Sequence, residues 1–283
     1  MIEKIRIGLQ DFSKHPPILV YQMGKVGSTT IYRSLQTAKL LNPVYHIHYL
    51  SPGNLEWDEQ RFVLARQKKI LEPKTLQHIQ TGHLLRSKLL RQADAPLYII
   101  TGVREPVSWT LSSFFQNIHY FCPDLLDEDG RAREQDTLRY LQSMFARFDE
   151  KRDLASNWFD IEFKKFFDVD IYQVPFNCRK GYTILEHGRL HVLILRQEDL
   201  RRTLSGALRE FLAIDQPIEV KESNVGTHKK HRQAYTFVKD NIRIPSEVCE
   251  RIYSTKYVRH FYDENTIAGF VQKWRDRTAE YAT

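Results

Sequence analysis

The stretch Ile18-Leu-Val-Tyr-Gln-Met-Gly-Lys-Val-Gly-Ser-Thr-Thr-Ile31 changes character along its length. Its first four residues are apolar, which predicts a buried strand, and the residues from Ser28 onward have the periodicity of an amphipathic helix. Between them lie two glycines, Gly24 and Gly27, and one lysine, Lys25. A glycine-containing loop between a strand and a helix exposes backbone N–H groups at the positive end of the helix dipole. The stretch therefore predicts a strand, a phosphate-binding loop and a helix.

The position of the lysine separates two classes of phosphate-binding loop. The nucleoside-triphosphate motif is Gly-x-x-x-x-Gly-Lys-Ser/Thr, with the lysine after the second glycine. Here Lys25 precedes Gly27 and hydroxyl residues follow, which resembles the 5′-phosphosulfate loop of the sulfotransferases. These enzymes use 3′-phosphoadenosine 5′-phosphosulfate (PAPS). The resemblance implies a metal-independent 5′-phosphate site formed by Lys25, Val26, Gly27, Ser28, Thr29 and Thr30.

A second segment has the family's other cofactor pattern. Residues 97–103 form an apolar, β-branched run that predicts a buried parallel strand, and Pro106 suits the first turn of the helix that follows. Arg104 then lies at the carboxyl end of a strand, where open α/β sheets bind ligands, and Ser112 lies about two turns into the helix. An arginine and a serine so placed resemble the sulfotransferase residues that hold the 3′-phosphate of PAPS. Taken alone, Arg104 could equally form a surface pair with Glu105.

Strand and helix patterns alternate along the first part of the chain, which predicts an α/β fold with a parallel sheet flanked by helices. Strands are expected at residues 18–21, 44–50 and 97–103. Helices are expected at about 28–40 and 55–71. A short helix that ends at residue 90 and another helix that begins at residue 106 are expected as well. A helical, aromatic insert is expected at about 120–170, and a hairpin at 182–195. At 283 residues the chain suits one domain. The resemblance implies the sulfotransferase version of the phosphate-loop nucleoside-triphosphatase (P-loop NTPase) fold.

Two histidines are candidates for the base that takes the acceptor's proton. His48 lies near the carboxyl end of the second expected strand, beside the phosphate loop, where glycosaminoglycan sulfotransferases place a catalytic glutamate or histidine. His83, in Thr81-Gly-His-Leu84, resembles the segment that carries the catalytic histidine of cytosolic sulfotransferases. Histidine suits the task because its ordinary pKa of about 6.5 leaves a neutral nitrogen near neutral pH. Each could instead be a structural histidine, and that interpretation is preferred for His46.

A basic loop at residues 223–232 is the last candidate element of the site. Sulfotransferases commonly close over the nucleotide with a basic, glycine-containing loop late in the chain. The resemblance implies that Lys229 and Lys230 contact the nucleotide. A solvated charged loop would explain the same residues.

Composition restricts the partners. The formal charge of +7 favours anionic ligands, but the basic residues are spread along the chain, and nucleic-acid-binding signatures are missing, so a nucleic acid is not the expected partner. Apolar runs fall short of the roughly 18 residues that span a bilayer, and the N-terminus lacks the apolar core of a signal peptide. Three widely spaced cysteines favour reduced thiols and a cytoplasmic protein.

The whole pattern, above all Tyr-Gln-Met-Gly-Lys-Val-Gly-Ser followed by Tyr-His-Ile-His, is similar to bacterial sulfotransferase-like proteins assigned to capsular polysaccharide synthesis. The resemblance implies transfer of a sulfuryl group from PAPS to a hydroxyl of a saccharide or glycolipid, with adenosine 3′,5′-bisphosphate as the product. Two alternatives stay open from the residues alone. One is a kinase-like phosphate-loop enzyme that uses ATP and magnesium, and the other is a polyanion-binding protein without catalysis.

Overall fold

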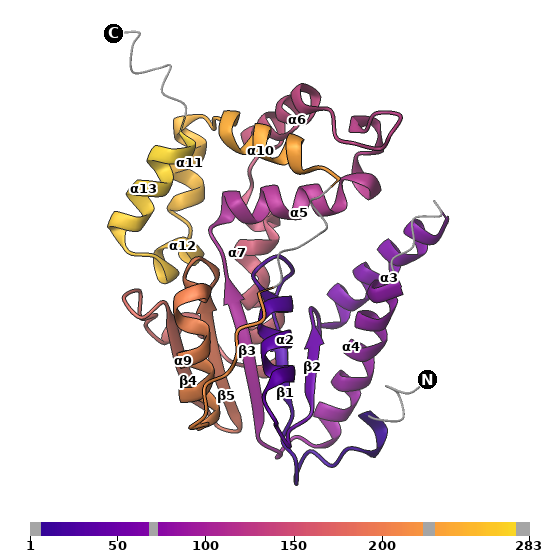
Figure 1. The fold of residues 1–283 in the computed structure, drawn as a ribbon, viewed down its shortest axis with the longest axis vertical. Coiled ribbons are helices and arrows are strands. Elements are labelled where there is room, and N and C mark those ends of the chain that lie inside the picture. Colours follow the sequence, from indigo (N-terminus) through magenta and orange to yellow (C-terminus); the bar gives the residue numbers. More distant parts are fainter. Residues whose placement is uncertain (1–6, 68–72, 223–229, 276–283) are drawn as a thin grey trace. The chain divides into compact units, whose positions relative to one another are not determined.

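A computed structural model describes residues 7–67, 73–222 and 230–275, which form a five-stranded sheet in the order β2-β1-β3-β5-β4 (Figure 1). The strands are β1 (Ile18–Tyr21), β2 (Val44–Ile47), β3 (Leu97–Val103), β4 (Tyr182–His187) and β5 (Leu190–Arg196). Strands β2, β1, β3 and β5 are parallel, and β4 pairs with β5 in the expected antiparallel hairpin. The helix-flanked, largely parallel α/β sheet is confirmed. Its assignment to the sulfotransferase fold stays a prediction.

Contacts along the chain define two compact units. The sheet unit comprises Met1–Arg104 and Trp158–Ser223, and the helical unit comprises Glu105–Asn157 and Asn224–Thr283. The main helices of the sheet unit are α2 (Ser28–Thr37), α3 (Pro52–Gln67), α4 (Pro73–Arg91) and α9 (Leu200–Leu212). Those of the helical unit are α5 (Pro106–Phe121), α6 (Glu134–Ala146), α10 (Arg232–Asn241), α11 (Ser246–Tyr253), α12 (Lys256–Phe261) and α13 (Glu264–Trp274).

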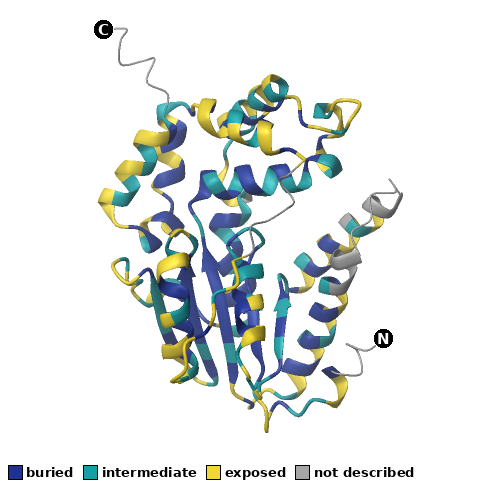
Figure 2. Ribbon diagram, in the orientation of Figure 1, coloured by how far each residue is buried: buried dark blue, intermediate teal, exposed yellow. Residues whose placement is uncertain are grey.

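Helices α2 and α9 cover one face of the sheet. Val20 and Leu193, on β1 and β5, pack in one buried cluster with Ile31 of α2 and Leu204 of α9. The buried residues of α9 recur at spacings of three and four, so one apolar stripe faces the strands. Figure 2 shows β1, β3 and β5 as almost wholly buried. Burial of each such aliphatic side chain stabilises the fold by about 1.5–3 kcal/mol, which fixes the strand ends near the candidate site.

An aromatic cluster covers the opposite face of β1. Because side chains alternate across a strand, Tyr21 points away from the face that Val20 occupies. The Tyr21 ring lies 5.0 Å from that of Trp158 and 5.5 Å from that of Phe163, measured between centroids. Both belong to the helical, aromatic insert expected at about 120–170, and both are buried, as is Phe159.

The order of the strands marks one place on the sheet as special. The chain passes from β1 outward to β2 and then returns past β1 to β3. The direction of winding therefore reverses between β1 and β3. Open α/β sheets bind ligands in the crevice outside the carboxyl ends of strands at such a reversal. The residues that follow these two strands are the phosphate loop and Arg104.

The largest difference from the expected elements lies after β2. The strand ends at Ile47 rather than near residue 50, and α3 already begins at Pro52. The short helix expected up to residue 90 is the long helix α4, which begins at Pro73. Proline is well tolerated in the first turn of a helix, which suits Pro73 to begin α4.

Candidate functional site

The phosphate loop spans residues 22–27, between β1 and α2. Gly27 is the N-cap of α2 and has a φ of 90°, which side chains rarely allow. A Cβ atom at this position would lie 2.2 Å from Cδ1 of Leu200 in the first turn of α9. Glycine is therefore required both by the backbone conformation and by the packing of α9 against the loop.

The N-terminus of α2 directs its first N–H groups toward the end of the loop. The first helical bond runs from Ile31 N to Gly27 O at 3.1 Å, so the N–H groups of Ser28, Thr29 and Thr30 precede it. Gly27 has no side chain with which to cap them. Val26 is fully buried and offers a ligand only its backbone. The arrangement has the form of an anion site at a helix N-terminus.

Lys25 adopts a backbone conformation that is unusual for a residue with a side chain. Its φ is 71°, in the left-handed region, which costs about 1–2 kcal/mol for a non-glycine residue. Burial, and to a lesser extent the Arg104 guanidinium, lowers the pKa of the Lys25 ammonium from 10.5 to about 8. Strain and desolvation at a cation are typical of positions retained for function.

Arg104 directly follows β3 and reaches the same loop. Its Nη1 donates a hydrogen bond to the main-chain oxygen of Lys25 at 2.9 Å, across 79 residues of sequence. The structure thus brings together two of the residues predicted from separate motifs. Both lie in the sheet unit, at the reversal of the strand order.

Two fully buried polar side chains lie close to this site in sequence, Gln22 directly after β1 and Thr101 in β3. In the described part of the chain, neither amide atom of Gln22 nor the hydroxyl of Thr101 has a hydrogen-bond partner. A buried polar group without a partner costs about 1–3 kcal/mol. Such unsatisfied groups point to a place where water or a ligand completes the bonding.

His48 lies immediately beyond β2, next to the phosphate loop. Its Nδ1 is 2.8 Å from the main-chain oxygen of Gln22. A carbonyl oxygen can only accept a hydrogen bond, so Nδ1 carries the proton in the neutral ring. Nε2 is then the nitrogen that can accept a proton.

Two further imidazoles surround His48. The ring centroids of His46 and His78 lie 5.1 and 5.0 Å from that of His48. Nδ1 of His78 donates to the main-chain oxygen of His46 at 2.9 Å. Burial first, and then the neighbouring histidines, lower the pKa of His46 to about 2, so its ring is neutral near pH 7.

His83 lies in a different environment. It belongs to the middle of α4, and its Nε2 is 2.7 Å from Oε1 of Glu59 on α3. The His83 and Glu59 side chains are 45% and 50% exposed. Its neighbour Gly82 faces the segment after β2, because a Cβ there would lie 2.9 Å from the Tyr49 main-chain oxygen.

The remaining predicted ligands belong to the helical unit. Ser112 is buried in α5, whose N-cap Glu105 accepts bonds from Val107 N and Ser108 N. Glu105 also accepts a bond from the Tyr253 hydroxyl at 2.6 Å, so this buried carboxylate holds the N-terminus of α5. Lys230 lies next to Gly130 within this unit, and Lys229 lies outside the described residues. The roles of Ser112, Lys229 and Lys230 stay predictions.

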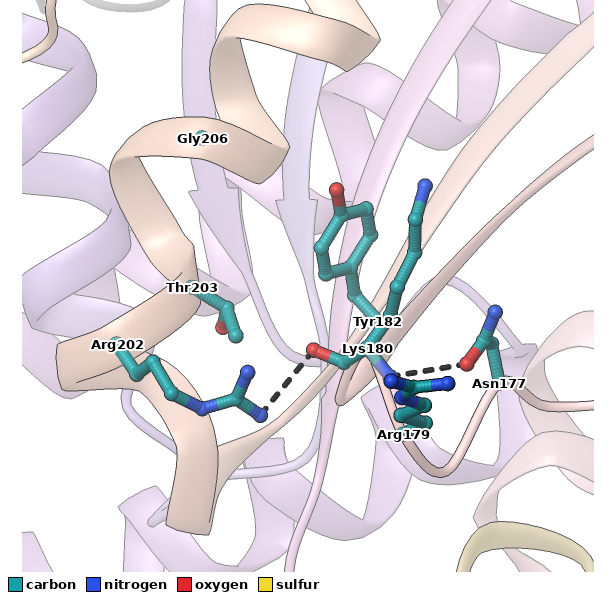
Figure 3. A pocket seen from close by; sticks show the side chains of 7 residues that line it. All are labelled: Asn177, Arg179, Lys180, Tyr182, Arg202, Thr203 and Gly206. Carbon is teal, nitrogen blue, oxygen red and sulfur yellow. Dashed lines mark hydrogen bonds between the residues drawn. The ribbon is translucent and has the colours of Figure 1, made fainter.

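A pocket of about 420 Å³ lies beside β4 and α9 in the sheet unit (Figure 3). Its lining comprises Asn177, Arg179, Lys180, Tyr182, Arg202, Thr203 and Gly206. Lys180 pairs with Glu210 at 3.1 Å, and Arg202 pairs with Asp199 at 2.9 Å. The protein's own carboxylates thus neutralise most of the charge that an anion would need.

Among the described residues, histidine, cysteine, aspartate and glutamate side chains form no group of three able to hold a metal ion. Across the same residues, every helix is too short or too polar to cross a membrane. All three cysteines are free thiols.

Sequence reasoning missed two residues of this region. His78 falls where the sequence indicated a break between helices, and only recognition of Pro73 as a helix start would have placed it on α4. Glu162 lies in the aromatic insert expected at about 120–170. Several acidic residues occur in this segment, and the sequence does not distinguish Glu162 from the others. It is fully buried and contacts the segment after His48. Its spacing from His48 gives no local signal.

Comparisons with known proteins add one finding. Residues 131–263 match the family model described as "Putative capsular polysaccharide synthesis protein". The matched range includes Glu162, β4, β5 and α9, and it begins after the phosphate loop, Arg104 and Ser112. No curated protein and no solved structure matches the chain. The match supports the link to capsular polysaccharide.

Proposed function

We propose that the protein is a PAPS-dependent sulfotransferase that modifies a hydroxyl of a saccharide or glycolipid. The observation that carries the proposal is the contact between Arg104 and the Lys25 main chain, beside the N-terminus of α2 and at the reversal of the strand order. The family description supplies the polysaccharide acceptor class. In this loop the lysine, Lys25, precedes the glycine, Gly27. That order favours a phosphosulfate over a nucleoside triphosphate as the ligand.

The residues of the loop fit the 5′-phosphate end of the cofactor. Gly27 leaves room beside the N-terminus of α2, and the first-turn N–H groups of Ser28, Thr29 and Thr30 suit phosphate oxygens. Bound PAPS would supply the sulfuryl group. When the sulfuryl group moves to the acceptor, the 5′-phosphate is the leaving group. Lys25 neutralises the negative charge that develops on this phosphate, which is the electrostatic part of the catalysis.

Arg104 is assigned to the 3′-phosphate, with Ser112 as the second ligand. A guanidinium offers five N–H donors, so the bond to the Lys25 carbonyl leaves others for a bidentate phosphate contact. That bond also fixes the direction in which the guanidinium approaches the loop. Arg104 is thereby suited to distinguish a bisphosphate from a monophosphate.

His48 is the better of the two base candidates. The bond from its Nδ1–H to Gln22 fixes the tautomer in which Nε2 accepts a proton, and Gln22 is the first residue of the phosphate loop. His83 is exposed and forms a pair with Glu59. In the proposed reaction, Nε2 of His48 takes the proton from the acceptor hydroxyl.

A thermal-shift experiment tests the proposal without knowledge of the acceptor. Adenosine 3′,5′-bisphosphate without magnesium should raise the melting temperature, because a ligand at a hundred times its dissociation constant adds about 2.7 kcal/mol to stability. We expect 5′-AMP to have a smaller effect. Stabilisation by ATP with magnesium alone would favour the kinase-like enzyme and refute the proposal.

Incubation with labelled PAPS and the polysaccharide fraction of the producing cells would then test transfer. Label in that fraction is expected with the wild-type protein and not with the Lys25→Met variant. Binding of adenosine 3′,5′-bisphosphate without any transfer to saccharide or lipid would leave a nucleotide-binding protein and overturn the proposed reaction.

A further inference from the structure

Glu162 is a buried carboxylate with donors on both of its oxygens. Oε2 accepts hydrogen bonds from Leu50 N at 2.8 Å, from Ser51 N at 2.9 Å and from the Tyr21 hydroxyl. Oε1 accepts from Ser51 Oγ at 2.5 Å and from Asn54 Nδ2 at 2.6 Å. The side chain is fully buried, and all of these residues belong to the sheet unit.

The donors around Glu162 match an ionised carboxylate. Five donors converge on two oxygens and use all of the roughly four lone-pair sites that an ionised carboxylate offers. Hydrogen bonds to a charged group contribute about 1.5–3 kcal/mol each, and loss of one partner leaves a costly buried charge. Glu162 is therefore a strong and specific tie between chain segments.

The backbone around Glu162 is a short π-helix, η3 (Phe159–Lys164). Helical segments of this kind are rare and occur frequently at functional sites. Trp158 and Phe163 on either side of Glu162 pack on Tyr21, which excludes water from the carboxylate. The aromatic cluster thus both buries Glu162 and fixes its position against β1.

The bonds of Glu162 lie on both sides of the contact between His48 and Gln22. Tyr21 immediately precedes Gln22, whose main-chain oxygen accepts the His48 bond. Leu50 and Ser51 follow His48 by two and three residues, and both N–H groups donate to Glu162. One carboxylate therefore holds both chain segments that the His48–Gln22 bond connects.

Helix α4 supports the same turn from a second direction. Nη1 of Arg86 donates to the Leu50 oxygen at 3.0 Å, and Gly82 approaches the Tyr49 oxygen closely. On its other side, Ile47 pairs with Tyr21 in the β1–β2 ladder. His48 is thus a short link between two fixed points.

We infer that Glu162 is the positioning residue that holds His48 with Nδ1–H on Gln22 and Nε2 available as the base. The inference rests on the proposed function for the catalytic meaning of His48, while the positioning itself is a property of the fold. Glu162 does not touch the reacting atoms. Its replacement should release the turn at residues 49–51, so the imidazole loses its fixed tautomer.

The Glu162→Gln variant tests this inference by ¹⁵N NMR of the histidine side chains, with the His48 signals assigned through His48→Gln. In the wild-type protein the neutral His48 ring should be the Nδ1–H tautomer. In Glu162→Gln we expect a mixture of His48 tautomers. Glutamine keeps one acceptor oxygen, but its NH₂ group replaces the other and faces N–H and O–H donors, so the turn after His48 loses part of its support. Label transfer from PAPS should fall at least tenfold, while affinity for adenosine 3′,5′-bisphosphate changes less than twofold.

A destabilised control separates positioning from general loss of stability. Leu185→Ala removes a buried side chain from β4, the edge strand opposite β2, and should lower the melting temperature without changing the His48 tautomer. If Glu162→Gln does not fold, Asn54→Ala removes a single donor to Oε1 and should shift the tautomer in the same direction. An unchanged His48 signal in the folded Glu162 or Asn54 variant would overturn the inference. If the wild-type protein does not bind adenosine 3′,5′-bisphosphate, the proposed function is refuted. The NMR result on the His48 tautomer would still be valid.

Discussion

The phosphate loop and the α9–β4 pocket are both basic, but their charges have different neighbours. At the loop, Lys25 and Arg104 lie together, and burial, with a smaller contribution from the Arg104 charge, lowers the pKa of Lys25 to about 8. At the pocket, Lys180 and Arg202 each pair with a carboxylate. Exposed pairs of this kind contribute only about 0–1 kcal/mol. The contrast favours the phosphate loop over the pocket as the proposed anion site.

Replacement of Lys25 should have the largest effect on transfer and should separate the loop from the pocket most clearly. We expect Lys25→Met to reduce transfer from labelled PAPS to near background, because it removes the cation nearest to the departing phosphate. In the absence of ligand, the variant should melt at a higher temperature than the wild type at pH 7, since a partly desolvated charge is gone. Lys180→Met is the matched control at the pocket, with both properties near wild type. A Lys25→Met variant with normal transfer would contradict the assignment of the loop.

The two histidines should separate by their effect on rate. Loss of a general base costs roughly 10²- to 10⁴-fold, so His48→Ala should reduce transfer by this amount and leave bisphosphate affinity near normal. His83→Ala should change the rate by less than twofold, because its ring pairs with Glu59 at the surface. Steady-state transfer of label to the polysaccharide fraction measures both. The reverse order of effects would assign the base to His83.

Arg104 should determine selectivity for the 3′-phosphate. Titration calorimetry of the wild type should show tighter binding of adenosine 3′,5′-bisphosphate than of 5′-AMP. Arg104→Ala should weaken the bisphosphate tenfold or more, because each charge-assisted bond contributes about 1.5–3 kcal/mol, and should change 5′-AMP little. Ser112→Ala should act in the same direction but more mildly. Equal weakening of both nucleotides would remove the 3′-phosphate assignment.

The parts of the fold predicted correctly from the sequence are those with strong local signals. The strand at 97–103, the helix start at Pro106 and the helix from Ser28 follow from apolar runs and from proline and glycine positions. Lys25 and Arg104 each have a local motif, and the structure adds only their contact. The sequence could not choose between His48 and His83, because exposure and tautomer depend on distant partners.

Glu162 shows most clearly why the remainder of the site was missed. Its five donors come from β1, from the turn after β2 and from the first turn of α3, more than a hundred residues earlier in the chain. Periodicity describes neighbours along one element and contains no information on such pairs. The π-helix that presents Glu162 also departs from the ordinary helical spacing.

The smallest expected effect is a dependence of binding on pH. Because the free protein's Lys25 has a pKa of about 8, and a bound phosphate should raise that pKa, binding takes up a proton at higher pH. Affinity for adenosine 3′,5′-bisphosphate should therefore be constant below pH 8 and fall above it, with a slope that approaches tenfold per pH unit. The stability of the free protein should change in the opposite direction. The unfolded chain holds the Lys25 proton up to about pH 10.5, so the free energy of unfolding gains a contribution as pH rises from 8 to 10.5. Calorimetry between pH 7 and 9.5, in buffers of different ionisation enthalpy, measures the proton uptake directly. Lys180→Met should reproduce the wild-type curve, whereas a wild-type curve without proton uptake would show that the phosphate does not lie beside Lys25.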